Sequence, residues 1–253
     1  MIPNPIRKVL SSIQTHRVRA LLMGGQACVF YGAAEFSRDT DLAILADAAN
    51  LSRLRAALAA LQAEVIAVPP LRLQYLRRGH AVHFRCRHPE AFRMRVDVMS
   101  VMRGVDSFNK LWARRATVTL PDGFSADLMS LPDLVNAKKT QREKDWPMLQ
   151  RLVEAHYFQH RATANASQLA FWFLELRTPE LLLELARRHP ALCRRLTSRR
   201  PLLACARLGD NSGLERGLRD EEDRERQADR ACWLPLRREL EALRHRPRAA
   251  RKS

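Results

Sequence analysis

Apolar residues in the first half of the chain alternate between helical spacing and short runs. Ile6, Val9, Leu10 and Ile13 recur at helical intervals, so residues 4–16 predict an amphipathic helix. Short apolar runs bounded by Gly, Pro or polar residues instead predict strands. The pattern predicts helices over 26–33 and 51–61, and strands over 19–23, 41–45, 64–68, 80–87, 93–99, 116–120 and 124–128.

The second half of the chain has a helical pattern. Ser130 with Asp133 three residues later is typical of a capping box that begins a helix. Residues 214–230 are densely charged with mixed sign, which favours a solvated helix or a frayed segment. The pattern predicts further helices over 133–144, 147–158, 167–175, 179–188, 191–196 and 202–208.

The change of pattern near residue 130 is the best domain boundary. We therefore expect an α+β fold in which a mixed sheet flanked by helices occupies residues 1–130. A mainly α-helical region follows over 131–243, and residues 244–253 form a basic tail that we expect to be disordered.

Charge is the most unusual feature of the composition. The 253 residues include 44 Lys and Arg against 27 Asp and Glu, a formal charge of +17, and 38 of the basic residues are Arg. This excess suits a polyanion such as nucleic acid. The alternative is a compositional habit of the source, since Arg, Ala and Leu are abundant throughout.

Several sequence features bear on location. No apolar run approaches the roughly 18 to 20 residues that a membrane span needs, so we expect no membrane partner. The N-terminus lacks the apolar core of a signal peptide. The five cysteines are scattered and odd in number, which indicates reduced thiols rather than a disulfide framework. We therefore expect a cytoplasmic protein.

Candidate chemistry concentrates in residues 22–45. Gly24-Gly25 follows an apolar run, and a glycine turn that opens a helix offers backbone N–H groups suited to a phosphate. Asp39 and Asp41 lie two apart on a strand and so share a face. Two such close carboxylates repel each other unless a cation lies between them, and oxygen ligands suit Mg²⁺ or Mn²⁺. Asp97, flanked by Val96 and Val98, supplies a third carboxylate.

These residues resemble the nucleotidyltransferase superfamily that shares the DNA polymerase β-like core. Met23-Gly24-Gly25, the Asp39-Thr40-Asp41 triplet and Asp97 match its motifs in order and spacing. Residues 130–146, with Lys138 and Lys139, resemble the helix after the core in minimal bacterial nucleotidyltransferases. That subgroup includes antibiotic nucleotidyltransferases and toxins of toxin–antitoxin pairs. The resemblance covers about residues 20–150.

The resemblance implies a metal-dependent enzyme that transfers an NMP from an NTP such as ATP to a hydroxyl acceptor, releasing pyrophosphate. Asp39, Asp41 and Asp97 would be the catalytic and metal-binding residues, with Mg²⁺ or Mn²⁺ as cofactor. Gly24, Gly25, Arg38, Lys138 and Lys139 would bind the nucleotide. The acceptor would be RNA or tRNA, a protein or a small molecule, and a toxin-like role would add a cognate partner protein.

Other interpretations of these residues stay open. Aligning Asp41 with the first acid would place Ala43 at the second and remove a ligand, whereas the Asp39/Asp41 alignment restores the expected gap. Asp97 alternatively pairs with a nearby arginine or lies exposed on an edge strand, and Arg38 alternatively pairs with a neighbouring acid. Lys138 and Lys139 alternatively lie on a solvated helix face. A catalytically inactive module of the same fold, binding nucleic acid or a protein, is the alternative function.

A cluster of possible zinc ligands lies on the strand predicted over 80–87 and just beyond it. It comprises His80, His83, Cys86 and His88. On a strand, His83 and Cys86 project to opposite faces, so ordinary strand residues are the preferred interpretation.

Overall fold

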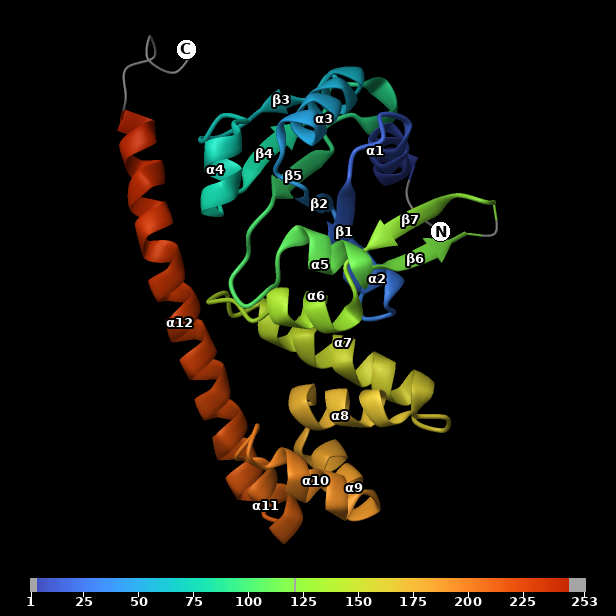
Figure 1. Cartoon of the computed structure of the whole chain (residues 1–253), viewed down its shortest axis with the longest axis vertical. Helices are drawn as coiled ribbons and strands as arrows, with labels where there is room; N and C mark the ends of the chain where they lie inside the picture. The colour runs from blue at the N-terminus through green and yellow to red at the C-terminus, as the bar shows by residue number, and fades with distance from the viewer. Residues whose placement is uncertain (1–3, 121, 246–253) are drawn as a thin grey trace. The chain divides into compact units, whose positions relative to one another are not determined.

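The computed structural model covers the whole chain, and it describes residues 4–120 and 122–245 (Figure 1). These residues form a seven-stranded mixed sheet and helices that predominate in the C-terminal part, which confirms the predicted α+β class. The described chain divides into two compact units. The first contains residues 4–30, 34–137 and 231–245, and the second contains 31–33 and 138–230.

The sheet belongs to the first unit. Its strand order is β3-β4-β5-β2-β1-β7-β6. The β2/β5 and β1/β7 pairs are parallel, and the other neighbouring pairs are antiparallel. The strands are β1 (Ala20–Met23), β2 (Asp39–Ile44), β3 (Glu64–Val65), β4 (Val82–Arg85), β5 (Arg95–Met99), β6 (Ala116–Thr119) and β7 (Ser125–Leu128).

Helices of the first unit precede, connect and follow these strands along the chain. The Asp47 side chain accepts a hydrogen bond from the Asn50 backbone N–H at 2.6 Å and so caps the helix between β2 and β3. The helices are α1 (Asn4–Thr15), α2 (Gly24–Phe30), α3 (Ala48–Ala60), α4 (Leu73–Arg78), α5 (Phe108–Ala113) and α6 (Leu131–Ala137), with a 3₁₀ turn over Pro89–Ala91.

One face of the central strands lies in the core. On β2, Thr40, Leu42 and Ile44 are buried, and Val96 and Val98 of β5 lie opposite Thr40 and Leu42. On the opposite face Ala43 is fully buried, but the other residues of that face on β2, β5 and β4 are only partly covered or exposed. Because strand residues alternate between faces, the polar residues of these strands collect on the partly covered face.

The second unit is helical, and aromatic side chains form much of its core. Trp172, Tyr157 and Phe173 are almost completely buried. Its helices are α7 (Asp145–His160), α8 (Ala166–Glu175), α9 (Pro179–Arg188), α10 (Pro190–Leu196) and α11 (Leu203–Leu208), followed by α12 (Asn211–His245). The first part of α12, to Arg230, belongs to this unit, and the rest belongs to the first unit.

Most predicted elements form within a few residues of their expected ends, and the exceptions are instructive. The expected strand over 64–68 is limited to Glu64–Val65, three residues short of Pro69-Pro70. The helices α4 and α5 were not predicted, because six residues give too little periodicity to detect. The charged segment 214–230 lies inside the single helix α12.

The helix expected over 133–144 is wrong in its C-terminal half. α6 ends at Ala137, and a turn separates it from α7. The Thr140 hydroxyl donates to Asp145 at 2.6 Å, and the Trp146 indole N–H donates to the Thr140 carbonyl at 3.0 Å. These side-chain bonds favour a turn over continued helix.

The predicted basic tail falls mostly outside the described residues. Arg244 and His245 belong to the last turn of α12. Residues 246–253 lie outside the part of the chain that the structure describes. Within the described part, no helix is both long enough and apolar enough to span a membrane.

Candidate active site

Three carboxylates occupy neighbouring positions on the partly covered face of the sheet. In the parallel β2/β5 pair, Asp41 lies directly opposite Asp97, and Asp39 lies opposite Arg95. Asp39 and Asp41 are two residues apart, about 6.6 Å along a strand, and neighbouring strands are about 4.8 Å apart. The sheet therefore places all three aspartates of the predicted site on one small area.

The β2/β5 pairing also bears on the alternative alignment, in which Asp41 and Ala43 would be the first and second acid positions of the motif. Ala43, two residues beyond Asp41, lies opposite Met99 and is fully buried. Asp39 and Asp41 are partly exposed. The two acids therefore share the accessible end of β2, whereas position 43 belongs to the packed interior.

Gly24 brings the backbone of α2 against the Asp41 carboxylate. Gly24 has φ +67°, and a Cβ there would lie 1.8 Å from Asp41 Oδ2. A Cβ on Gly25 would lie 2.8 Å from Ser37 Oγ. Gly24 is therefore required both by close approach and by a left-handed backbone conformation, whereas at Gly25 the Ser37 hydroxyl would have to rotate away.

Asp97 is bound by two side chains from its own sheet face. Arg95 Nε donates to Asp97 Oδ1 at 2.9 Å, and His83 Nδ1 lies 2.9 Å from the same oxygen. His83 lies opposite Asp97 in the antiparallel β4/β5 pair. An ionised carboxylate only accepts hydrogen bonds, so the 2.9 Å contact is a hydrogen bond in the form of His83 that carries a proton on Nδ1. The salt bridge expected as an alternative for Asp97 is thus present.

Electrostatics link Arg95 to all three acids. Burial by itself would raise the pKa of Asp97, but hydrogen bonds from His83 and Arg95 hold that pKa below its ordinary value. The hydrogen bond to Asp97 and the charges of Asp97, Asp39 and Asp41 raise the pKa of Arg95. The Arg95 guanidinium is therefore a positive charge that faces a cluster of three negative charges.

The donor set suits a hard divalent cation. It consists of carboxylate oxygens only, which Mg²⁺ and Mn²⁺ prefer. As the side chains stand, no three His, Cys, Asp or Glu side chains within residues 4–120 and 122–245 lie close enough to hold a metal ion. Asp97 is turned to Arg95 and His83. A cation held by all three acids would therefore require Asp97 to leave Arg95.

The remaining predicted nucleotide ligands have local partners or lie exposed. Arg38 is exposed, and its guanidinium carbon lies 5.9 Å from the centre of the Phe36 ring. In the second unit, Lys138 contacts Asp145 at 3.4 Å, and Lys139 contacts Glu175 at 2.7 Å. Their side chains are 12% and 20% exposed, so neither lies on a solvated helix face. Their expected nucleotide role stays a prediction.

Arg95 and His83 are site residues that sequence reasoning does not single out. Arg95 precedes Asp97 by two residues, and that spacing alone puts both on one face of a strand. His83 has the pattern of an ordinary strand residue. Its contact with Asp97 depends on the β4/β5 register, for which the local sequence carries no signal.

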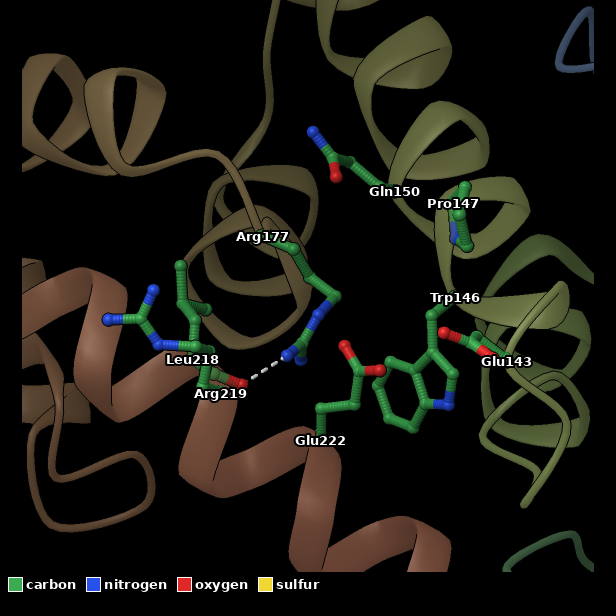
Figure 2. A pocket seen from close by; sticks show the side chains of 8 residues that line it. All are labelled: Glu143, Trp146, Pro147, Gln150, Arg177, Leu218, Arg219 and Glu222. Carbon is green, nitrogen blue, oxygen red and sulfur yellow. Dashed lines mark hydrogen bonds between the residues drawn. The ribbon is translucent and has the colours of Figure 1, made fainter.

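A separate cavity of about 310 Å³ lies within the second unit (Figure 2). Arg177 extends into it, with its guanidinium 4.7 Å from the centre of the Trp146 ring, and donates to the Leu218 carbonyl. Burial and the charge of Arg200 lower the pKa of Arg177. Arg177 also contacts Glu221 at 3.5 Å. The cavity is therefore lined by residues in and just before α7, by Arg177 from the α8–α9 connection and by the first part of α12.

Comparison of the chain with protein-family models and with curated proteins finds no match. What the fold and site define is a mixed α+β protein with three aspartates and one arginine on an accessible sheet face.

Proposed function

We propose that the protein is a metal-dependent nucleotidyltransferase that transfers an NMP from an NTP to a hydroxyl acceptor and releases pyrophosphate. The observation that carries this proposal is the β2/β5 register, which sets Asp41 opposite Asp97 with Asp39 two residues earlier on the same face. Three carboxylates in such a small area are costly unless cations offset their repulsion.

Each residue of the site has a role in this proposal. Asp39, Asp41 and Asp97 would hold the divalent cations, and Asp97 would also accept the proton of the acceptor hydroxyl. The cations, when bound, offset the charge that develops on the departing pyrophosphate. The acceptor oxygen attacks the α-phosphorus in line as the bond to the bridging β-phosphate oxygen breaks. Positioning and electrostatics supply most of the rate enhancement.

The two glycines define the end of the site nearest α2. Gly24 leaves the Asp41 carboxylate room against the backbone, and Gly25 does the same for Ser37. In the proposed function, the backbone at Gly24 and Gly25 contacts the triphosphate. Arg38, Lys138 and Lys139 stay candidates for further nucleotide contacts.

The charge of the chain favours a polyanionic acceptor. A formal charge of +17 attracts RNA or tRNA and repels a cationic drug of the aminoglycoside kind. A protein hydroxyl or another small molecule is the alternative acceptor. RNA is therefore the first acceptor class to test.

The test is transfer of labelled NMP by the full chain with Mg²⁺, using each of the four NTPs against total RNA, purified tRNA and cell lysate. Asp41→Asn should lower transfer roughly 100-fold or more, because a preorganised charged group at the reacting centre is lost. Asp223→Asn, an exposed carboxylate on α12, is the matched control and should transfer like the wild type. Equal transfer by Asp41→Asn would reject the proposal.

A second candidate is a catalytically inactive module of the same fold that binds nucleic acid or a protein. The observation that favours it is the pairing of Asp97 with Arg95 and His83, which uses the third carboxylate within the protein. In that case no NTP would be consumed. RNA binding would weaken steeply as the salt concentration rises, and Asp41→Asn would bind RNA as tightly as the wild type.

A further inference from the structure

Arg95 holds a position that the alternation of β5 dictates. It precedes Asp97 by two residues, lies opposite Asp39 in β2, and so projects on the same face as all three acids. Its Nε donates to Asp97 Oδ1 at 2.9 Å, and its Nη2 lies 3.2 Å from His83 Nδ1. The Arg95 guanidinium therefore lies at the position that a cation bound by Asp97, Asp39 and Asp41 would occupy.

Asp97 and Arg95 differ in how deeply their side chains are buried. The Asp97 side chain is 12% exposed, whereas the Arg95 side chain is 40% exposed. The buried carboxylate needs a positive partner, because an unpaired buried charge is strongly destabilising. The long and partly exposed arginine can reach solvent by side-chain rotation alone. Arg95 is thus the partner that can leave.

We propose that Arg95 is the internal counter-ion of the acidic sheet face, which a divalent cation displaces from Asp97, and that the displaced guanidinium then binds the triphosphate. This inference rests on the proposed nucleotidyltransferase function. It makes Arg95 a competitor of the metal and a ligand of the nucleotide.

Charge explains the exchange. A divalent cation carries twice the charge of a guanidinium and can contact several carboxylates at once, so it offsets the repulsion among three acids more completely. Arg95 stays tethered two residues from Asp97 and remains at the edge of the site after it leaves. A guanidinium there presents paired N–H groups, whose geometry matches two phosphate oxygens.

The two roles predict opposite effects of one substitution. Removing the guanidinium with Arg95→Met leaves Asp97 available and removes a competing charge, so metal should bind more tightly. The same change removes a phosphate ligand, so the nucleotide should bind more weakly. A purely structural role for Arg95 would weaken both together.

The first measurement is Mn²⁺ binding to the full chain without nucleotide, followed by electron paramagnetic resonance of free Mn²⁺. Arg95→Met should lower the Kd for Mn²⁺ about tenfold. Arg87→Met, which removes an equal charge from an exposed pair with Glu64 in the same unit, should stay within about twofold of the wild type. Asp97→Asn should weaken Mn²⁺ binding and so locate the ion at this site.

The second measurement is steady-state transfer at saturating Mn²⁺. Arg95→Met should raise KM for the NTP about tenfold, because a bidentate phosphate contact is lost. Arg95→Lys keeps the charge without the fork, so it should leave Mn²⁺ affinity near that of the wild type and still raise KM. If Arg95→Met does not fold, Arg95→Lys still tests the role of Arg95 through its KM for the NTP.

The outcomes separate the inference from the proposed function. If the wild type binds Mn²⁺ and transfers NMP but Arg95→Met changes neither constant, or weakens both, the role of Arg95 is wrong and the enzyme assignment stands. If Arg95→Met does not fold, an unchanged KM in Arg95→Lys rejects the role. If the wild type neither binds Mn²⁺ nor transfers NMP, the proposed function fails and the inference fails with it.

Discussion

The carboxylate of Asp41 lies so close to the backbone of Gly24 that a Cβ at position 24 would come within 1.8 Å of Asp41 Oδ2. Asp41 lies opposite Met23 in the β1/β2 pair, so the residue after Met23 turns directly over the carboxylate. The first glycine of the motif is thus coupled to the second acid through space. This contact explains why the two occur together in one short segment.

Gly24→Ala should displace the Asp41 carboxylate and lower NMP transfer more than tenfold. The matched control is Gly104→Ala, since Gly104 has φ +70° and a Cβ added there would meet no atom within 4 Å. Both substitutions put an L side chain in a left-handed conformation, at a cost of about 1 to 2 kcal/mol. Urea unfolding and transfer assays together check this. Equal transfer by the two variants would show that the clash with Asp41 is unimportant.

Arg200→Lys should destabilise the second unit although it keeps the charge. The Arg200 side chain is almost completely buried and donates to Phe173 O at 2.9 Å, Leu176 O at 2.8 Å and the Glu221 carboxylate at 2.8 Å. A lysine ammonium cannot span these acceptors, so the free energy of unfolding should fall by about 2 to 4 kcal/mol. Chemical denaturation measures this.

The control for Arg200→Lys is Arg199→Lys, at an exposed neighbouring residue. This substitution should change the free energy of unfolding by less than about 0.5 kcal/mol. If Arg200→Lys matched that control, the buried arginine network would contribute little. The contrast also separates structural arginines from those that add only to the surface charge.

Asp145→Asn should also destabilise the second unit. The Asp145 carboxylate is buried and accepts from Lys138 at 3.4 Å, Thr140 at 2.6 Å and Arg142 at 2.8 Å. Burial by itself would raise its pKa, but the charge of Lys138 and these hydrogen bonds hold the pKa below its ordinary value. The neutral amide breaks a buried ion pair, so stability at pH 7 should fall by about 3 kcal/mol.

The pH dependence of this contribution has a definite sign. Because the folded pKa of Asp145 is lowered, the stabilisation is present above the ordinary pKa near 4 and is lost as the pH falls below it. Asp145→Asn should therefore show less loss of stability on acidification than the wild type. Glu143→Gln, an exposed neighbour, is the control, and an equal acid response in both variants would contradict the prediction.

His156 should make the second unit less stable at mildly acidic pH. The Trp172 indole N–H donates to His156 Nδ1 at 2.9 Å, which requires that nitrogen to be unprotonated. Burial, with a smaller contribution from His160, lowers the pKa of His156 to about 4. The unfolded chain has a histidine pKa near 6.5 and binds more protons between these values, so stability falls as the pH drops through this window.

Urea unfolding at pH 7.5 and pH 5 measures this effect. His156→Asn offers an amide oxygen near the position of Nδ1 without a titrating group, so its stability should depend less on pH over this interval. His245→Asn, exposed at the end of α12, is the control and should keep the dependence of the wild type. An unchanged pH dependence in His156→Asn would contradict the assignment.

Local sequence was enough to predict the elements that carry Gly24, Gly25, Asp39 and Asp41. The apolar run before the glycines predicts β1, and the spacing of two predicts that both acids share a face of β2. These features depend on neighbours within a few residues, so periodicity reveals them. The α+β class followed in the same way, from alternating short runs and helical spacing.

What only the tertiary structure decided is which distant residues meet. The pairing of Asp41 with Asp97 depends on the β2/β5 register, and that of His83 with Asp97 on the β4/β5 register. Strand register is set by packing of the buried face, such as Leu42 beside Val98, and the β2/β5 pair joins segments more than 50 residues apart. The sequence by itself therefore determined which acids are present and how each is oriented on its strand. The sheet decided that Arg95 also faces Asp39 and Asp41, because these residues come together only once β2 and β5 are aligned.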